Sequence, residues 1–583
     1  MPESYGKRID SITGFQATTM ALLQAICLTL PAMKIQPLLV FCVTALICAA
    51  CDSPREDMRP NIVLILADDL GYSDIGPFGS EIRTPTLDNL AATGITFTNF
   101  HTTPTCGPTR AMLMSGIDPH PVGMAANAAA IRRVAALQGR RGYDSRLNDD
   151  AVTVATLLSD AGYQTYMTGK WDLGNIAGSL PVDRGFDKSF ILADGGGSHF
   201  SNAFGILASD PKPRYFENGT ALDALPDDFY STRTYTERAV EFIEGGDVEK
   251  PFFAYVAYTA PHWPLHVPDD WIGKYKGSYD AGWHALKTAR LTRQKQLGLF
   301  ADAPDSGPLP GVEDWQSLSA ADRTRNARTM EIYAAMIEYM DWQIGHLLES
   351  VAVTSGDRPT LIIFMSDNGP EGNAIGRIGT NDVWVDATFN NDIDNMGKHD
   401  SYLWTGPGWA QASAAPFHLY KSFVTEGGIR APAIMKYSAS SSAGETSDAF
   451  LVATDIPATI LDVAGVSHPG TRYAGREVLP IEGRSALPIL AHGAPAVHQD
   501  EPLGWELYGN RALVKDQWKA VLLWPPRGDG EWRLYDLEVD PFEKNDLSGQ
   551  HPEVLEQLIT EWHAYADDKG IYLFESDNGY GRY

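Results

Sequence analysis

The segment Arg59–Asp69 constrains the fold of this chain more than any other. It reads RPNIVLILADD, an uninterrupted run of β-branched and leucine residues that ends in two carboxylates. Such a continuous apolar run is typical of a strand buried on both faces, at the centre of a mostly parallel sheet that helices cover. Ligands of these sheets bind where the strands end. We therefore expect an α/β fold whose functional site includes Asp68 and Asp69.

Other segments alternate between strand and helix patterns. Apolar runs predict strands, and apolar positions at helical spacing between suitable end residues predict helices. The strands are expected at 163–168, 251–258 and 360–366, and the helices at 85–94, 151–162 and 330–351. This alternation favours a large mixed, mostly parallel sheet flanked by helices.

The pattern of the sequence changes after about residue 485. Short aromatic-rich strands around Trp505, Trp518 and Trp532, with a helix near 552–567, predict a smaller antiparallel sheet lobe. We therefore divide the chain into a leader (1–51), a linker (52–58), a main domain (59–484) and a C-terminal subdomain (485–583). A polar stretch at about 270–328 is expected to be a surface insertion in the main domain.

The charge balance excludes some partners. The 583 residues include 46 Lys and Arg against 74 Asp and Glu, a formal net charge of −28. An acidic surface repels phosphate backbones, so we expect no nucleic-acid partner, whereas a bound divalent cation fits the charge. An apolar share of 44% is enough for a well-buried core and argues against disorder.

The segment that begins at Met33 has the three parts of a secretory signal peptide. Lys34 is the basic start, Leu38–Ala50 is the apolar middle, and small residues form the exit. Because residues 1–32 add nothing that such a signal needs, Met33 is the expected translation start. The end of the run also resembles the box of bacterial lipoproteins, with Cys51 at the position that receives the lipid.

Two residues bear on this lipid anchor. Cys48 stands where that box usually has leucine, and Asp52 resembles the signal that keeps lipoproteins at the inner membrane. An ordinary cleaved signal is the alternative. Both interpretations predict an exported, periplasmic protein, which lipid at Cys51 would anchor to the inner membrane. Export leaves Cys106 as the only thiol of the mature chain, so the fold must depend on its core and not on disulfides.

Polar residues follow the predicted strands. Asp68 and Asp69 follow the first strand, Asp367 and Asn368 follow 360–366, and His262 lies just after 251–258. Carboxylate and amide oxygens are hard ligands that suit Ca²⁺ or Mg²⁺. Taken singly, each acidic pair is more typical of a turn or a helix cap than of a metal site. Two such pairs at sheet exits make a shared metal site an equal alternative.

Cys106 opens the segment CGPTR. Pro108 suits the first turn of a helix, which would place the thiol at a helix amino end, where free N–H groups favour anions and activate nucleophiles. Arg110 could hold an anionic group or neutralise the nucleophile. The alternative is a partly buried structural thiol.

The segment Cys106–Arg110 matches the C-x-P-x-R signature of the type I sulfatases, in the alkaline phosphatase superfamily. In these enzymes the cysteine is converted after synthesis to formylglycine. Further motifs resemble the family in the right order: NIVLILADDLGYSDIG, TGKWDLG, SDNG, YKSFVTEGGIR, and LYDL with DPFE near the end. The likeness covers about residue 59 to the end, and the insertion resembles that of the bacterial arylsulfatases.

The resemblance implies that the main domain is catalytic and binds one Ca²⁺. The implied ligands are Asp68, Asp69, Asp367, Asn368 and the hydrated formylglycine derived from Cys106. A formylglycine-generating enzyme is the implied maturation partner. Sulfate monoesters, above all aryl sulfates, are the implied substrates.

The same resemblance implies roles for the other site residues. Arg110 and Lys170 would hold the formylglycine and the sulfate, and His262 and Lys421 would contact the sulfate and assist the leaving oxygen. The hydrate would attack sulfur, with Asp367 accepting one of its protons and His262 donating a proton to the leaving group. We expect the pocket walls to come from 125–147, 175–230 and 380–418.

Asp172 departs from the family pattern, which usually has histidine two residues after the lysine. That histidine is thought to contact the formylglycine and to take its second proton. A carboxylate can also serve as a base, provided that its neighbours do not depress its pKa too far. The hypothesis is an active enzyme with altered product release or altered substrate preference.

Two other functions stay open at this point. A phosphonate monoester or phosphodiester hydrolase of the same superfamily would use the same nucleophile and metal, and would differ in its contacts to the leaving group. A non-catalytic lipoprotein that binds sulfated glycans would hold its ligand without releasing sulfate.

Overall fold

The computed structural model describes residues 58–304, 307–374, 380–498 and 501–573. The expected signal peptide, the start at Met33 and the lipid-anchor residue Cys51 lie outside the described residues, so export and the periplasmic location stay predictions. In the described ranges, no helix has both the length and the apolar character that a membrane span requires.

An eleven-stranded sheet forms the centre of the fold, with the order β10-β2-β9-β8-β1-β7-β3-β4-β5-β6 and with β11 beside β2. The central strand β1 (Asn61–Ala67) is buried along its whole length and runs parallel to β7 (Phe252–Ala257) and β8 (Thr360–Ser366). β3 (Gln164–Lys170) continues the parallel set beside β7, followed by β4 (Lys188–Leu192). The predicted α/β fold with a large, mostly parallel sheet is confirmed.

The other strands of this sheet lie towards its edges. They are β2 (Ile95–His101), β5 (Tyr215–Glu217), β6 (Thr220–Ala221), β9 (Arg430–Tyr437), β10 (Glu445–Ser447) and β11 (Leu451–Val452). β9 is antiparallel to both of its neighbours, which makes the sheet mixed. A short separate hairpin joins β12 (Arg472–Tyr473) to β13 (Arg476–Glu477).

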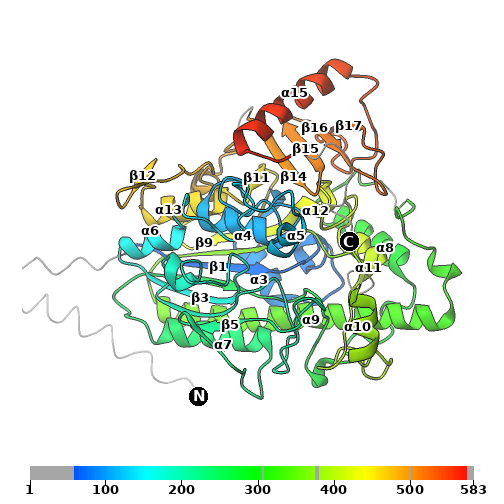
Figure 1. Cartoon of the computed structure of the whole chain (residues 1–583), viewed down its shortest axis with the longest axis horizontal. Helices are drawn as coiled ribbons and strands as arrows, with labels where there is room; N and C mark the ends of the chain where they lie inside the picture. The colour runs from blue at the N-terminus through cyan, green and yellow to red at the C-terminus, as the bar shows by residue number, and fades with distance from the viewer. Residues whose placement is uncertain (1–57, 305–306, 375–379, 499–500, 574–583) are drawn as a thin grey trace, which may run out of the picture. The chain divides into compact units, whose positions relative to one another are not determined.

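Helices cover both faces of the main sheet, as Figure 1 shows. Alternate residues of β1 therefore enter two different cores: Val63 and Ile65 lie on one side, and Ile62 and Leu64 on the other. The first core includes residues of α3 (Pro85–Thr93), α7 (Ser231–Glu244) and α9 (Ala320–Ser355). The second includes residues of α4 (Cys106–Ser115), α6 (Val154–Asp160), α13 (Asp455–Ala464) and α14 (Leu487–His492).

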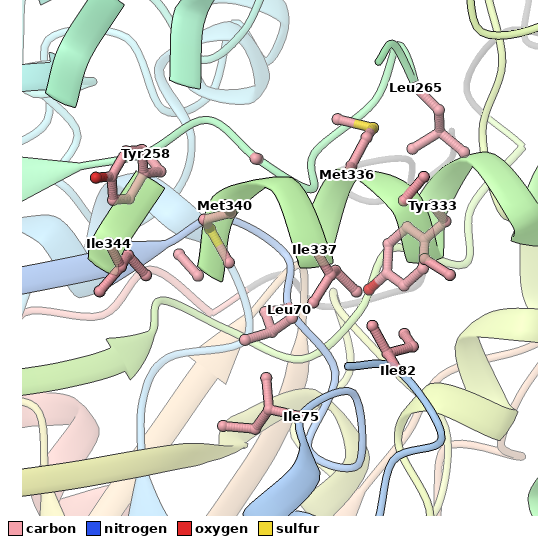
Figure 2. Packing of buried hydrophobic residues seen from close by; sticks show 14 of the residues in the cluster. Leu70, Ile75, Ile82, Tyr258, Leu265, Tyr333, Met336, Ile337, Met340 and Ile344 are labelled. Atoms are coloured by element: carbon pink, nitrogen blue, oxygen red, sulfur yellow. The ribbon is translucent and has the colours of Figure 1, made fainter. Parts of the chain in front are cut away.

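Helix α9 fixes the loop that follows β1. Its buried residues Ile337 and Met340 face Leu70 in that loop (Figure 2). The hydroxyl of Tyr333 donates to the carbonyl of Asp69 at 3.3 Å and to the Asp74 carboxylate at 2.7 Å. The sequence predicts this helix only from residue 330, but it begins ten residues earlier at Ala320. The Ser319 side chain caps that end by accepting from the amide of Asp322, and the added turns are polar, so their apolar periodicity is weak.

The stretch 270–328 contains α8 (Trp283–Gln296) and two short 3-10 turns. Trp283 is buried against Trp315 and Trp409, with ring centroids 4.7 and 5.6 Å away. Arg290 is also buried, and its guanidinium contacts Asp74 and Glu81 of the main domain. The stretch is thus held to the core by aromatic packing and by ion pairs.

The described part of the main domain also contains other short helices. They are α5 (Ala128–Arg133), α10 (Thr380–Thr388), α11 (Gly406–Ser413) and α12 (Glu426–Ile429), with 3-10 turns at Gly76–Phe78 and Pro181–Arg184. α5 and α12 matter for the site because they lie in the two segments that follow Cys106 and Lys421.

The C-terminal lobe is a four-stranded antiparallel sheet, as predicted. Its strands are β14 (Leu503–Leu507), β15 (Asn510–Lys515), β16 (Trp518–Leu522) and β17 (Trp532–Asp536). Helix α15 (Pro552–Lys569) packs on one face of this sheet through the buried Trp562 (Figure 1). On the other face, Trp505 contacts Val424 and Ile429, which belong to the segment after Lys421.

His120 joins the lobe to the main domain. Its Nδ1 lies 2.9 Å from Asp118, and its Nε2 lies 3.3 Å from Glu506 on β14. Tyr565 of α15 donates to the same Asp118 at 2.6 Å. Burial opposes a charge on His120, but the hydrogen bonds to the two carboxylates outweigh it and raise the pKa of His120 to about 9.

We predict that this contact weakens in alkaline solution. The folded-state pKa of about 9 exceeds the unfolded value of about 6.5, so the stabilisation is fully present below pH 6.5 and is lost as pH rises through 9. The loss amounts to about 3 kcal/mol of unfolding free energy. Urea unfolding at pH 6.5 and 9.5 measures it. The His120→Gln variant should lose about 3 kcal/mol less than the wild type over this interval, and equal losses would exclude His120 as the cause.

Candidate active site

The ends of four adjacent parallel strands bring the predicted site residues together. β8, β1, β7 and β3 lie side by side in that order. The residues at or just after their carboxyl ends are Asp367 and Asn368 (β8), Asp68 and Asp69 (β1), His262 (β7) and Lys170 (β3). The expectation that both acidic pairs share one edge of the sheet is confirmed.

Cys106 is the first residue of α4, so the expected helix amino end is also confirmed. The residue is buried, and its Sγ lies 3.4 Å from Oδ1 of Asp68 and 3.7 Å from Oδ1 of Asp69. Burial raises the pKa of the Cys106 thiol well above its usual value, although Lys170 and Lys421 act in the opposite direction. The thiol is therefore protonated at neutral pH.

Arg110 lies one helical turn after Cys106 and is fully buried. Its Nη2 and Nε donate to Oδ2 of Asp367 at 2.7 and 3.1 Å, and its Nη1 donates to the carbonyl of Lys170 at 2.7 Å. In this structure Arg110 thus ties α4 to the ends of β8 and β3. Burial, followed by the charge of Asp68, raises the pKa of Asp367 to about 6.

Two lysines neutralise the aspartates after β1. Lys170 Nζ lies 2.8 and 3.0 Å from the carboxylate oxygens of Asp68, and Lys421 Nζ lies 2.7 and 2.9 Å from those of Asp69. Burial opposes both lysine charges, but the carboxylates outweigh it and raise the pKa of each lysine. Lys421 in turn holds the pKa of Asp69 below its usual range despite its burial. Lys170, Lys421 and Asp69 are therefore charged at neutral pH.

His262 faces this cluster with one ring nitrogen. Its Nε2 lies 3.6 Å from Oδ2 of Asp69, and its Nδ1 contacts the carbonyl of Trp263. Burial lowers the pKa of His262 well below its usual value, so the ring is neutral in this state. Because Nδ1 carries the proton that the carbonyl accepts, Nε2 is unprotonated. Proton donation from Nε2 requires the imidazolium form, which an anionic substrate favours.

Asp172 lies beside the cluster in a left-handed backbone conformation (φ +54°). Its carboxylate is 91% buried and lies 4.0 Å from Lys170 Nζ. Among the described residues, no hydrogen-bond donor reaches this carboxylate. Burial raises the pKa of Asp172 to about 6, although Lys170 and Arg110 act in the opposite direction. Asp172 is thus a buried acid that receives no hydrogen bond from the described residues, and its pKa lies close to neutrality.

The oxygen atoms at the strand ends fit a divalent cation. Ligand atoms of Asp68, Asp69, Cys106 and His262 all lie within 4.8 Å of one another. The amide nitrogen of Asn368 donates to Asp69 at 2.7 Å, while its buried Oδ1 has no hydrogen-bond partner. An unsatisfied buried acceptor next to carboxylates is the environment that a hard cation such as Ca²⁺ completes.

A cavity of about 140 Å³ opens over these residues. Cys106, Asp172, His262 and Lys421 line it, whereas Arg110 and Lys170 do not. Its walls come from 127–133 and 193–213, inside two of the three segments expected to shape the pocket. None of the lining residues belongs to 380–418, the third expected segment.

Glu371 and Tyr508 line the cavity but were not predicted from the sequence, and His199 supports the site without lining the cavity. Glu371 lines the cavity 3.6 Å from Lys421 Nζ, and only its closeness to the SDNG motif could have indicated it. His199 contacts the carbonyl of His262 through Nε2 at 3.0 Å and so supports that loop. Tyr508 reaches the cavity from the turn between β14 and β15, and no sequence signal connects it to the site.

Comparisons with known proteins agree with this geometry. The Sulfatase family model matches residues 60–466, and a model described as N-sulphoglucosamine sulphohydrolase, C-terminal, matches 417–565. An arylsulfatase of Klebsiella aerogenes is 36% identical over 74% of this chain and 92% of its own length. An uncharacterized sulfatase of Schizosaccharomyces pombe is 40% identical, covering 91% of this chain and 97% of that protein.

Solved structures show the same relationship. The crystal structure of Ps i-CgsB superposes with a TM-score of 0.63 and 25% identity, over 89% of this chain and 96% of that one. The strand-end cluster, the family model and the relatives all lead to the same conclusion. This chain belongs to the sulfatase family of the alkaline phosphatase superfamily and is a sulfuric ester hydrolase.

Proposed function

We propose that the chain hydrolyses sulfate monoesters, with aryl sulfates as the substrate class, through formylglycine at position 106 and one bound Ca²⁺. The observation that carries the proposal is the setting of Cys106. It begins α4 beside two carboxylates at the floor of the cavity, yet burial keeps its thiol protonated and therefore weakly nucleophilic. Formylglycine would supply a hydrated aldehyde whose hydroxyl is the nucleophile, and a formylglycine-generating enzyme would be the partner that makes it.

The ion would be held by the oxygen atoms at the strand ends. Its ligands would be Asp68, Asp69, Asp367, Asn368 and the modified residue 106. The three carboxylates lie against three basic side chains, Arg110, Lys170 and Lys421, so the cluster by itself is close to neutral. When bound, Ca²⁺ supplies positive charge that offsets the charge building on the sulfuryl oxygens.

The basic residues divide into two groups by their exposure to the cavity. Lys421 and His262 line it and are placed to contact the sulfate and the leaving oxygen. His262 would donate its proton from Nε2 once an anionic substrate favours the imidazolium. Arg110 and Lys170 lie behind the lining, where they hold Asp367 and Asp68 in position. Their positive charges would stabilise a bound anion through space, without direct contact from the cavity lining.

Asp172 is our candidate for the base that the family histidine provides. It lines the cavity, accepts no hydrogen bond from the described residues, and has a pKa of about 6. A carboxylate with this pKa is largely ionised at neutral pH and can accept a proton from a hydroxyl at residue 106. The presence of Asp172 in place of the family histidine is also what would favour a phosphorus ester over a sulfate ester, because a carboxylate changes the charge next to the reacting group.

The aryl class is supported by the cavity walls and by one relative. Trp263, Ile206 and Leu207 give one wall an apolar surface that suits an aromatic ring. The Klebsiella aerogenes relative is named an arylsulfatase, whereas a Bacteroides thetaiotaomicron relative, 25% identical over 91% of this chain, is named N-acetylglucosamine-6-O-sulfatase. The higher identity favours the aryl class.

The first test compares esters of sulfur and phosphorus. We expect matured protein, with the aldehyde at position 106 verified by mass, to hydrolyse 4-nitrophenyl sulfate with a kcat/KM roughly 100-fold above that of the matching phosphate monoester and diester. The Cys106→Ala variant is the control and should be inactive. A preference for either phosphorus ester would assign the chain to the phosphonate or phosphodiester hydrolases. Tight binding of sulfated glycans without sulfate release would instead indicate the non-catalytic lipoprotein.

The second test concerns the metal. Removal of Ca²⁺ with a chelator should abolish sulfate ester hydrolysis, and added Ca²⁺ should restore it. The Asn368→Ala variant should bind Ca²⁺ about 10- to 100-fold more weakly in calorimetric titration, because it loses a buried oxygen ligand. Asn373→Ala is the matched control, since Asn373 lines the cavity but donates to Glu371. Unchanged Ca²⁺ affinity in Asn368→Ala would refute the proposed ligand set.

The third test concerns pH. A base with a pKa of about 6 is ionised above that value, so kcat should fall about tenfold per pH unit below pH 6. Asp172→Asn should lower kcat and remove this acidic limb from the kcat–pH profile. Asp172→His should move the limb to higher pH, towards the ordinary histidine value of about 6.5. If Asp172→His changed neither the rates, the affinities nor the substrate preference, Asp172 would have no special role.

A further inference from the structure

The segment 127–147, which forms one wall of the cavity, is basic in an acidic chain. Five arginines occur between residues 132 and 146, although the whole chain carries a net charge of −28. Arg132 and Arg133, in the last turn of α5, line the cavity. Arg132 is exposed, and within the described ranges its guanidinium forms no hydrogen bond or ion pair. The cavity mouth therefore presents a positive charge that the protein itself does not use.

The acidic residues at the same mouth are already engaged. Arg214 contacts Asp194 at 2.5 Å and Asp210 at 2.9 Å, so its one positive charge is shared between these two carboxylates. Glu371 lies against Lys421 and accepts from Asn373. Asp172 is the exception, and it lies beside Lys170, next to the cluster at the strand ends. Each of these carboxylates therefore has a cation other than Arg132 beside it, which leaves the guanidinium of Arg132 open to an anionic group of a ligand.

Apolar side chains also line the cavity. They are Ala128 and Ala129 of α5, Ile206, Leu207 and Trp263. A ring placed there would remove apolar surface from water while its sulfate reaches Lys421 and His262. An anionic substituent on the same ring could then reach the guanidinium, whose planar fork matches a carboxylate.

We propose that Arg132 selects aryl sulfates that carry a second anionic group, a carboxylate on the ring. This inference rests on the proposed sulfate ester hydrolysis at the floor of the cavity and names its substrate class more closely. A uronate in a sulfated disaccharide presents the same carboxylate chemistry. The apolar side chains of the cavity favour an aromatic ring over a sugar as the group that carries the carboxylate.

The test uses a phenyl sulfate with a ring carboxylate and its carboxamide, which has nearly the same shape without the charge. Wild-type protein should prefer the carboxylate in kcat/KM, and Arg132→Gln should reduce this preference about tenfold. Rising ionic strength should weaken the wild-type preference. Arg141→Gln is the matched control, because Arg141 pairs with Asp150, is 72% exposed and does not line the cavity. It should keep the wild-type preference.

Calorimetric binding to chains that carry Cys106→Ala separates this inference from the proposed function, because it requires neither maturation nor turnover. In that background the carboxylate should bind more tightly than the carboxamide, and Arg132→Gln should remove the difference. If this binding result is found but matured protein hydrolyses no sulfate ester, the proposed function is refuted and the inference about Arg132 stands. The inference is overturned if Arg132→Gln weakens binding of the carboxylate and the carboxamide equally. It is also overturned if Arg132→Gln and Arg141→Gln have equal effects. Selectivity for a sulfated uronate disaccharide over the aryl carboxylate would overturn the aryl assignment.

Discussion

The structure depends on the mutual neutralisation of buried charges at one edge of the sheet. Asp68, Asp69 and Asp367 meet there, and like charges at such a distance in a buried site are costly unless each is paired. The compensating cations come from α4, from the end of β3 and from the segment after 416, so no single element is sufficient. Loss of any one cation would leave an unpaired buried charge, which is a large penalty for a folded protein.

The scaffold makes this concentration of charge tolerable. β1 is apolar on both faces and lies between two cores, so its carboxyl end is fixed by packing and not by the polar residues themselves. Tyr333 of the long helix α9 adds a direct contact to the backbone of Asp69. The site residues are therefore held in place by apolar contacts made several residues away.

The parts of the site that follow directly from strand ends could be predicted from the sequence. The two acidic pairs needed only a parallel sheet to bring them together, and Pro108 was enough to place Cys106 at a helix start. Contacts between distant segments could not be predicted in this way. The use of Arg110 to hold Asp367, and the approach of Tyr508 from the C-terminal lobe, are set by tertiary packing, which no local pattern encodes. The strand β15 was missed because its residues lack the aromatic pattern of its neighbours.

The contacts of the C-terminal lobe have a consequence for when Cys106 can be modified during synthesis. Trp505 donates to the carbonyl of Thr102, four residues before Cys106, and Lys519 pairs with Glu426, five residues after Lys421. The segments that carry Cys106 and Lys421 are thus held by residues that leave the ribosome about 400 positions after Cys106. Any enzyme that modifies this cysteine as an accessible segment has its opportunity during that interval, because the finished fold leaves the side chain almost no exposed surface.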